Sequence, residues 1–318
     1  MGAIYEYTDT VRYSKVDGEL KLTIAAMIDY FQDAAIEQSE VLGVGTKAIN
    51  TRNLAWFLTS WDVRIHRMPE LNERIVIGTY PYYFRGMLGK RAVYMKTADG
   101  EILAEGDAQW ALMNTAEMRM TRIPEDLLAA YELGDGPLFE SRNRRILAPD
   151  GAGKDYDDVP VQEYMLDNNG HINNGQFVRL GMSYMPTDRG FTWLRVEYKK
   201  QARLGDVLRP VRFSDDDRDV VVLKNGDDGD AFGLAAVAGD HHFKAVPPQI
   251  QAQELGDIAV VLNDQSAFAH VLPSAVCFDP VVFIIHRRPR QRLKNCKKQA
   301  FGEPEACFCM MLIIRRNR

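Results

Sequence analysis

Apolar and polar residues alternate in several stretches of the first 120 residues, which is the pattern of half-buried strands. In the clearest stretch Trp61, Val63 and Ile65 alternate with polar residues. Asp99-Gly100 is a tight-turn pair and predicts a hairpin between the last two strands. The other predicted strands cover residues 4–13, 75–79, 92–95 and 104–112.

Between the first two of these strands, apolar residues recur every third or fourth position from Ile24 to Ala35. The spacing predicts one long helix, with Thr23 as its cap and with Gly43 and Gly45 at its end. A helix with one apolar stripe must bury that stripe on another element. The predicted fold class is therefore α+β, a long helix wrapped by a curved antiparallel sheet.

The second half of the chain repeats this order. Ile172-Asn173-Asn174 corresponds to Leu22-Thr23-Ile24 at an offset of 150, and Val196-Glu197-Tyr198 corresponds to Val63-Arg64-Ile65 at an offset of 133. A shorter connection between helix and strand explains the change in offset. Two units that share one extended sheet are predicted, and chance similarity of amphipathic patterns is the alternative.

These patterns divide the chain into four parts. The first unit is expected at 1–125 and the second at 156–238, and the turn-rich segment 126–155 is expected to link them. Residues 239–318 have no repeat and are expected to be a poorly ordered tail. The stretch 277–318 has ten Lys or Arg against three acidic residues, a net charge of +7, although the whole chain has −5.

All four cysteines lie in that last stretch, so the body of the chain cannot use a thiol nucleophile, a disulfide or a thiolate metal site. No cofactor or metal is expected. The basic tail has no accompanying nucleic-acid motif, and no apolar run reaches membrane-spanning length, so neither nucleic acid nor membrane is an expected partner. The start of the chain has no targeting signal, which predicts a cytoplasmic protein.

The candidate chemistry lies in the segment 167–175, where Asp167, Asn169 and His171 precede a second helix start near Asn174. A carboxylate can accept a proton, a carboxamide can bond a carbonyl or a water, and imidazole titrates near neutrality. Alternate residues of an extended segment face the same side, and helix-start N–H groups can polarise a carbonyl. The set is typical of a hydrolase, and a purely structural role for His171 is the alternative. At the offset of 150 only the aspartate recurs, which predicts one active site, in the second unit.

On these residues the chain resembles the acyl-acyl-carrier-protein thioesterases, the double hotdog family of plant plastids and bacteria. The resemblance covers about residues 1–238 and rests on Arg12-Tyr13-Ser14, Trp61–Ile65, Asp167–Gly175 and Val196–Ala202. It implies a tandem hotdog fold, catalytic roles for Asp167, Asn169 and His171, and acyl-chain selection mainly by the first hotdog. Plant members have Glu-Cys where this chain has Gln201-Ala202, so a cysteine mechanism is excluded and Gln201 can act only through hydrogen bonds.

The expected activity is hydrolysis of acyl-carrier-protein thioesters to free fatty acids, which ends chain elongation. Gln201 and Asn174 are expected to support the catalytic set. Asp167 or His171 activates a water, or Asp167 itself attacks, and His171 could instead protonate the departing thiolate. The alternatives are an acyl-CoA or aroyl-CoA thioesterase on the same fold and a non-catalytic acyl-binding regulator. The expected partner is acylated carrier protein, and a homodimer could form. Several basic residues could meet the acidic carrier or could form a solvated face: Arg64, Arg67, Arg85, Lys90, Arg91, Lys199, Lys200 and Arg203.

Overall fold

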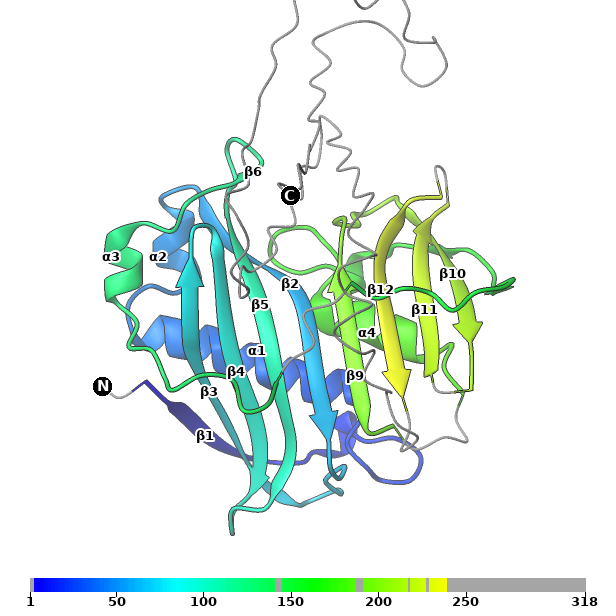
Figure 1. Cartoon of the computed structure of the whole chain (residues 1–318), viewed down its shortest axis with the longest axis horizontal. Coiled ribbons are helices and arrows are strands. Elements are labelled where there is room, and N and C mark those ends of the chain that lie inside the picture. Colours follow the sequence, from blue (N-terminus) through cyan, green and yellow to red (C-terminus); the bar gives the residue numbers. More distant parts are fainter. Residues whose placement is uncertain (1–2, 141–144, 187–190, 217, 227–228, 239–318) are drawn as a thin grey trace, which may run out of the picture. The chain divides into compact units, whose positions relative to one another are not determined.

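The strands of the described residues form a single antiparallel sheet (Figure 1). The computed structural model describes residues 3–140, 145–186, 191–216, 218–226 and 229–238. The expectations for the tail and for its cysteines lie outside these residues. The strand order along the sheet is β1-β3-β4-β5-β2-β9-β12-β11-β10-β7.

Along the strand order, strands from the first half of the chain lie next to one another at one end of the sheet, and strands from the second half lie at the other end. The first five strands are β1 (Tyr5–Thr10), β2 (Leu54–Ile65), β3 (Arg74–Arg85), β4 (Leu88–Thr97) and β5 (Ile102–Asn114). The main strands of the second half are β9 (Trp193–Tyr198), β10 (Val207–Ser214), β11 (Arg218–Asn225) and β12 (Ala231–Ala238). Three short strands lie at the margins: β6 (Arg119–Met120), β7 (Lys154–Asp155) and β8 (Val159–Pro160).

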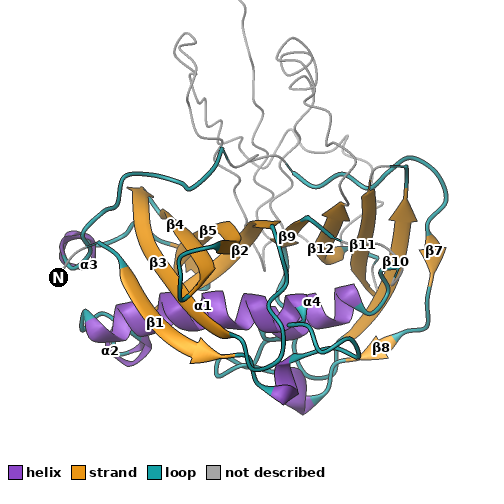
Figure 2. Ribbon diagram, turned by 90° about the horizontal axis from the view of Figure 1, so that it is seen from below, coloured by secondary structure: helices purple, strands orange, loops and turns teal. Residues whose placement is uncertain are grey.

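Helices α1 (Ile24–Val41) and α4 (Asn174–Met182) lie along the same face of the sheet (Figure 2). The predicted start of α1 is confirmed, because Thr23 Oγ1 accepts a hydrogen bond from the Ala26 N–H at 3.2 Å. Its predicted end is also confirmed, since Gly43 follows the last turn with φ of 75°. Two short helices accompany them, α2 (Thr46–Asn50) and α3 (Glu125–Ala129). No helix in the described ranges is long and apolar enough to cross a membrane.

The internal repeat is present in the backbone. The isolated bridge Val16↔Leu22 recurs as Leu166↔Ile172 at the offset of 150. The bridge Lys21↔Glu70 recurs as His171↔Arg203, which combines the offsets of 150 and 133. Each half is a helix wrapped by antiparallel strands, so the predicted tandem hotdog of class α+β is confirmed.

The two hotdogs join where β2 pairs with β9. At this seam Trp61 stands opposite Val196, and both are fully buried. One core cluster continues across it, with Phe31 of α1 and Phe177 of α4 among its members. Burial of apolar surface therefore links the two halves.

Two elements differ from the predictions. The first strand ends at Thr10 rather than continuing to residue 13, and α2 has no counterpart among the predicted helices. The segment expected as a linker contains α3 and buries Leu127 and Tyr131 against the first hotdog and Ile146 against β11. The division of the chain into four parts remains a prediction.

The sheet and α4 pack closely at Gly233 of β12. A Cβ on Gly233 would lie 2.5 Å from the Glu197 carbonyl oxygen and 2.5 Å from Phe177 Cζ. Gly233→Ala should therefore lower the free energy of unfolding by about 1–3 kcal/mol, measured by urea denaturation. Gly18→Ala is the matched control, because nothing lies within 4 Å of its Cβ position. Equal stability of the two variants would contradict the prediction.

Candidate functional site

Asp167 closes a tight loop in front of α4. Its Oδ1 accepts hydrogen bonds from the backbone N–H of Asn169 at 2.8 Å and of His171 at 3.2 Å. The Asp167 N–H donates to the His171 carbonyl at 2.7 Å, and Gly170 supplies a φ of 74°. One carboxylate oxygen of Asp167 is therefore committed to holding the loop.

The first hotdog contains the same loop without the candidate chemistry. There Asp17 Oδ1 accepts from the N–H of Glu19 at 2.9 Å and of Lys21 at 3.0 Å. The Asp17 N–H donates to the Lys21 carbonyl at 2.8 Å, and Leu20 has a φ of 61°. The aspartate closes the loop in both hotdogs, whereas Asn168, Asn169 and His171 of the second loop replace Gly18, Glu19 and Lys21 of the first.

His171 is buried, with 8% of its surface exposed. Arg203 Nε donates to His171 Nε2 at 3.1 Å, so Nε2 must accept and the ring proton is assigned to Nδ1. Burial lowers the pKa of His171, the Arg203 cation lowers it further, and Asp167 acts in the opposite direction. His171 is therefore held neutral as a donor through Nδ1, which is buried without a hydrogen-bond partner among the described residues.

Gln201 provides a second such donor. Its Nε2 is buried and has no partner within the described ranges. His171 is bridged to Arg203, and the Ile172 N–H donates to the Ala202 carbonyl at 2.9 Å. These contacts place the backbone of Gln201 next to the segment that carries His171. An acceptor such as a water or a carbonyl oxygen would satisfy either donor.

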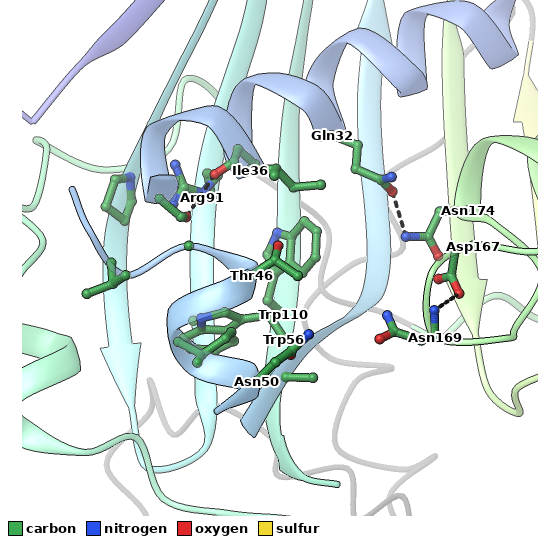
Figure 3. A pocket seen from close by; sticks show the side chains of 18 of the residues that line it. Gln32, Ile36, Thr46, Asn50, Trp56, Arg91, Trp110, Asp167, Asn169 and Asn174 are labelled. Atoms are coloured by element: carbon green, nitrogen blue, oxygen red, sulfur yellow. Dashed lines mark hydrogen bonds between the residues drawn. The ribbon is translucent and has the colours of Figure 1, made fainter. Parts of the chain in front are cut away.

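A cavity of about 160 Å³ lies between α1, α2 and strands β2 to β5 of the first hotdog (Figure 3). Trp56 and Trp110 line it, whereas Trp61 belongs to the core. Its other apolar lining residues are Ala35, Ile36, Val44, Ile49, Ala55, Pro81 and Phe84.

The loop before α4 forms one end of this cavity. Asp167, Asn169 and Asn174 line it there (Figure 3). His171 and Gln201 do not contribute to the lining. The structure therefore divides the predicted set into three residues that face the cavity and two that lie outside its lining.

The backbone N–H groups at the start of α4 are partly hydrogen-bonded within the protein. Asn173 Oδ1 accepts from the N–H groups of Gly175 at 2.8 Å and of Gln176 at 3.4 Å. Asn174 Nδ2 donates to Gln32 Oε1 of α1 at 2.7 Å. Asn173 therefore caps the start of α4 by bonding two of its N–H groups. Among the described residues, the Asn174 N–H is left without a hydrogen-bond acceptor.

Comparison with known proteins gives these features a context. Residues 2–131 match the family described as the acyl-ACP thioesterase N-terminal domain. The chloroplastic acyl-[acyl-carrier-protein] hydrolase FATB3 of Cuphea viscosissima is 21% identical over 230 residues, which cover 67% of this chain and 56% of that protein. The chain thus spans little more than half the length of this relative.

Over residues 2–131 the chain is similar to the acyl-ACP thioesterase family.

Two solved structures of acyl-ACP thioesterases share the fold. The enzyme of Bacteroides thetaiotaomicron has a TM-score of 0.67 at 16% identity and matches 74% of this chain and 97% of its own. The 12:0-ACP thioesterase of Umbellularia californica has a TM-score of 0.67 at 20% identity and matches 75% of this chain and 97% of its own.

A carboxylate from the first hotdog, Asp29, lies beside α4, and the sequence did not indicate this contact. A Cβ on Gly175 would lie 1.8 Å from Asp29 Oδ1, so only glycine leaves room for this contact. Burial raises the pKa of Asp29, against the opposing effects of Lys15 and Arg179. A negative charge near a helix N-terminus is favourable. The sequence feature that could have indicated this contact is Asp29 itself, a charged residue between the buried Ile28 and Tyr30 of α1.

Two of the basic residues that could have met an acidic carrier protein are not on the surface of this chain. Arg91 is 7% exposed, and the side chain of Lys90 is 12% exposed and lies 3.8 Å from Asp107. Arg67 is paired with Glu73 at 2.8 Å. The surface assignment of Arg91 and Lys90 is wrong, because both line the cavity instead.

Proposed function

We propose that this chain hydrolyses thioesters of acyl carrier protein and releases free fatty acids, which ends chain elongation. The observation that carries the proposal is one cavity in the first hotdog that Trp56, Trp110 and other apolar side chains line in part, with Asp167, Asn169 and Asn174 at one end. An acyl chain would lie along Trp56 and Trp110, with its thioester beside the loop. This division gives chain selection to the first hotdog and chemistry to the second.

The polar residues have separate roles in this proposal. The Asn169 carboxamide, which has no hydrogen-bond partner among the described residues, and the Asn174 N–H bond the thioester carbonyl and stabilise the oxyanion. Asp167 either takes a proton from a water that attacks the carbonyl carbon or attacks that carbon itself. The carbon–sulfur bond then breaks, and the departing thiolate takes up a proton. In the covalent route a water then hydrolyses the anhydride between the acyl group and Asp167, which releases the free acid and restores the carboxylate.

His171 and Gln201 support this chemistry as hydrogen-bond donors. In the observed arrangement His171 has no free lone pair to accept a proton, because Nε2 accepts from Arg203 and Nδ1 carries the ring proton. Its Nδ1 and Gln201 Nε2 are available to hold a water or the carbonyl behind the loop. Asp167 is therefore the group in this set that can accept the proton of a water.

The test is a comparison of kcat/KM for carrier-protein and CoA thioesters across a series of acyl chain lengths. We expect faster hydrolysis of the carrier-protein thioesters and release of the free acid. Preference for CoA thioesters would favour an acyl-CoA or aroyl-CoA thioesterase. Binding of acyl carrier protein without turnover would favour an acyl-binding regulator, and either result would overturn the proposal.

A further inference from the structure

Arg91 of β4 is a buried cation in the wall of the cavity proposed to hold the acyl chain. Only 7% of its surface is exposed. Burial lowers the pKa of Arg91 to about 10, so it is still charged at neutral pH. In Figure 3 Arg91 lies at the opposite end of the cavity from Asp167 and Asn169. If a bound acyl chain ended in a methyl group, the charged Arg91 guanidinium would lie next to hydrocarbon without a counter-charge.

The protein satisfies this guanidinium only in part. Arg91 Nη1 donates to Gln38 Oε1 and to Thr79 Oγ1, the latter at 3.3 Å. In the described part of the chain, Nε and Nη2 have no hydrogen-bond acceptor and no carboxylate pairs with Arg91. The Arg91 guanidinium also makes a cation–π contact with the ring of Tyr131, whose centroid lies 5.7 Å from the guanidinium carbon.

The residues around Arg91 at this end of the cavity are also polar. Tyr131 donates its hydroxyl proton to Ser39 Oγ at 2.8 Å, and Ser39 donates to the Ala35 carbonyl at 2.9 Å. These two groups are already bonded to each other. Arg91 is therefore the group here with spare donors, and its planar fork suits a carboxylate.

We propose that Arg91 forms a subsite for a carboxylate at the far end of the acyl chain, so that the preferred substrates are carrier-protein thioesters of dicarboxylic acids. This inference rests on the proposed function and names the substrate class of the same site. The carboxylate would accept from Nη2 and Nε and neutralise the buried cation. The thioester of the same chain would lie beside Asp167 and Asn169.

The experiment uses the full chain and pairs of acyl-carrier-protein substrates with equal carbon number. One member of each pair ends in a methyl group and the other in a carboxylate. At the chain length that spans the cavity, kcat/KM should favour the carboxylate-ended substrate by about ten- to a hundredfold, the range for hydrogen bonds to charged groups. Preference for the methyl-ended substrate at every length would overturn the proposal.

Two substitutions test Arg91 directly. Arg91→Met keeps an unbranched side chain without charge and should reverse the preference, whereas Arg91→Lys should retain part of it. For chains too short to reach Arg91, the ratio of kcat/KM for carboxylate-ended and methyl-ended substrates should be the same in wild type and Arg91→Met, whatever the absolute rate, and circular dichroism checks folding. An equal substrate ratio in wild type and Arg91→Met would also overturn the proposal.

A failure of the proposed function is distinguishable from a failure of the subsite. If wild type hydrolyses no carrier-protein thioester, calorimetric titration with free dicarboxylic and monocarboxylic acids replaces the kinetic assay. Binding of the dicarboxylic acid that Arg91→Met abolishes would support the subsite alone. Absence of such binding would overturn it.

Discussion

Replacing Asp167 by alanine should abolish hydrolysis of acyl-carrier-protein thioesters, whereas Asp17→Ala should leave the rate within a few-fold of wild type. Both aspartates close the same loop with the same pair of backbone hydrogen bonds. Only Asp167 lies at the cavity. Loss of a positioned proton acceptor lowers kcat by about a hundred- to ten-thousandfold.

The internal repeat makes Asp17→Ala a matched control for the structural part of the change. Each variant loses two hydrogen bonds to an aspartate, so both should lower the thermal unfolding midpoint by a similar amount. Steady-state kinetics and thermal unfolding are measured on the same preparations. An equal loss of activity in both variants would assign the effect to loop stability, and retained activity in Asp167→Ala would contradict the catalytic role.

The parts of the fold that were predicted correctly depend on local sequence. Thr23 and Gly43 act within one turn of α1, and Asp99-Gly100 acts within one hairpin, where Gly100 has a φ of 95°. The repeat was recognisable because each copy carries the same short segments at fixed offsets. Helix α2 was missed because five residues are too few to show a helical period.

The arrangement of the site depends on contacts between distant segments. Arg91 looks like a surface residue in the sequence, and its burial follows from the packing of β4 against α1 and Tyr131. Asp29 and Gly175 are far apart in sequence and meet because α1 and α4 share one face of the sheet. The spacing of Asp167, Asn169 and His171 predicted convergence on one cleft, but the tight loop turns His171 away from the cavity lining.

His171→Ala should lower kcat by about a hundred- to a thousandfold, because it removes a buried donor from behind the catalytic loop. His171→Asn should retain much more activity than His171→Gln. The amide nitrogen of asparagine can occupy the position of Nδ1, and that of glutamine reaches the position of Nε2, where Arg203 already donates. The three variants therefore separate the two ring nitrogens.

The same series separates hydrogen bonding from proton transfer. A donor at Nδ1 needs no titration, so His171→Asn should leave the pH dependence of kcat/KM unchanged while its level falls modestly. The measurement is a pH–rate profile for wild type and the three variants, with folding checked by circular dichroism. If His171→Asn were as inactive as His171→Ala, His171 would have to transfer a proton during the reaction. Arg203 would then have to leave Nε2 before each turnover, because that nitrogen can accept a proton only when its lone pair is free.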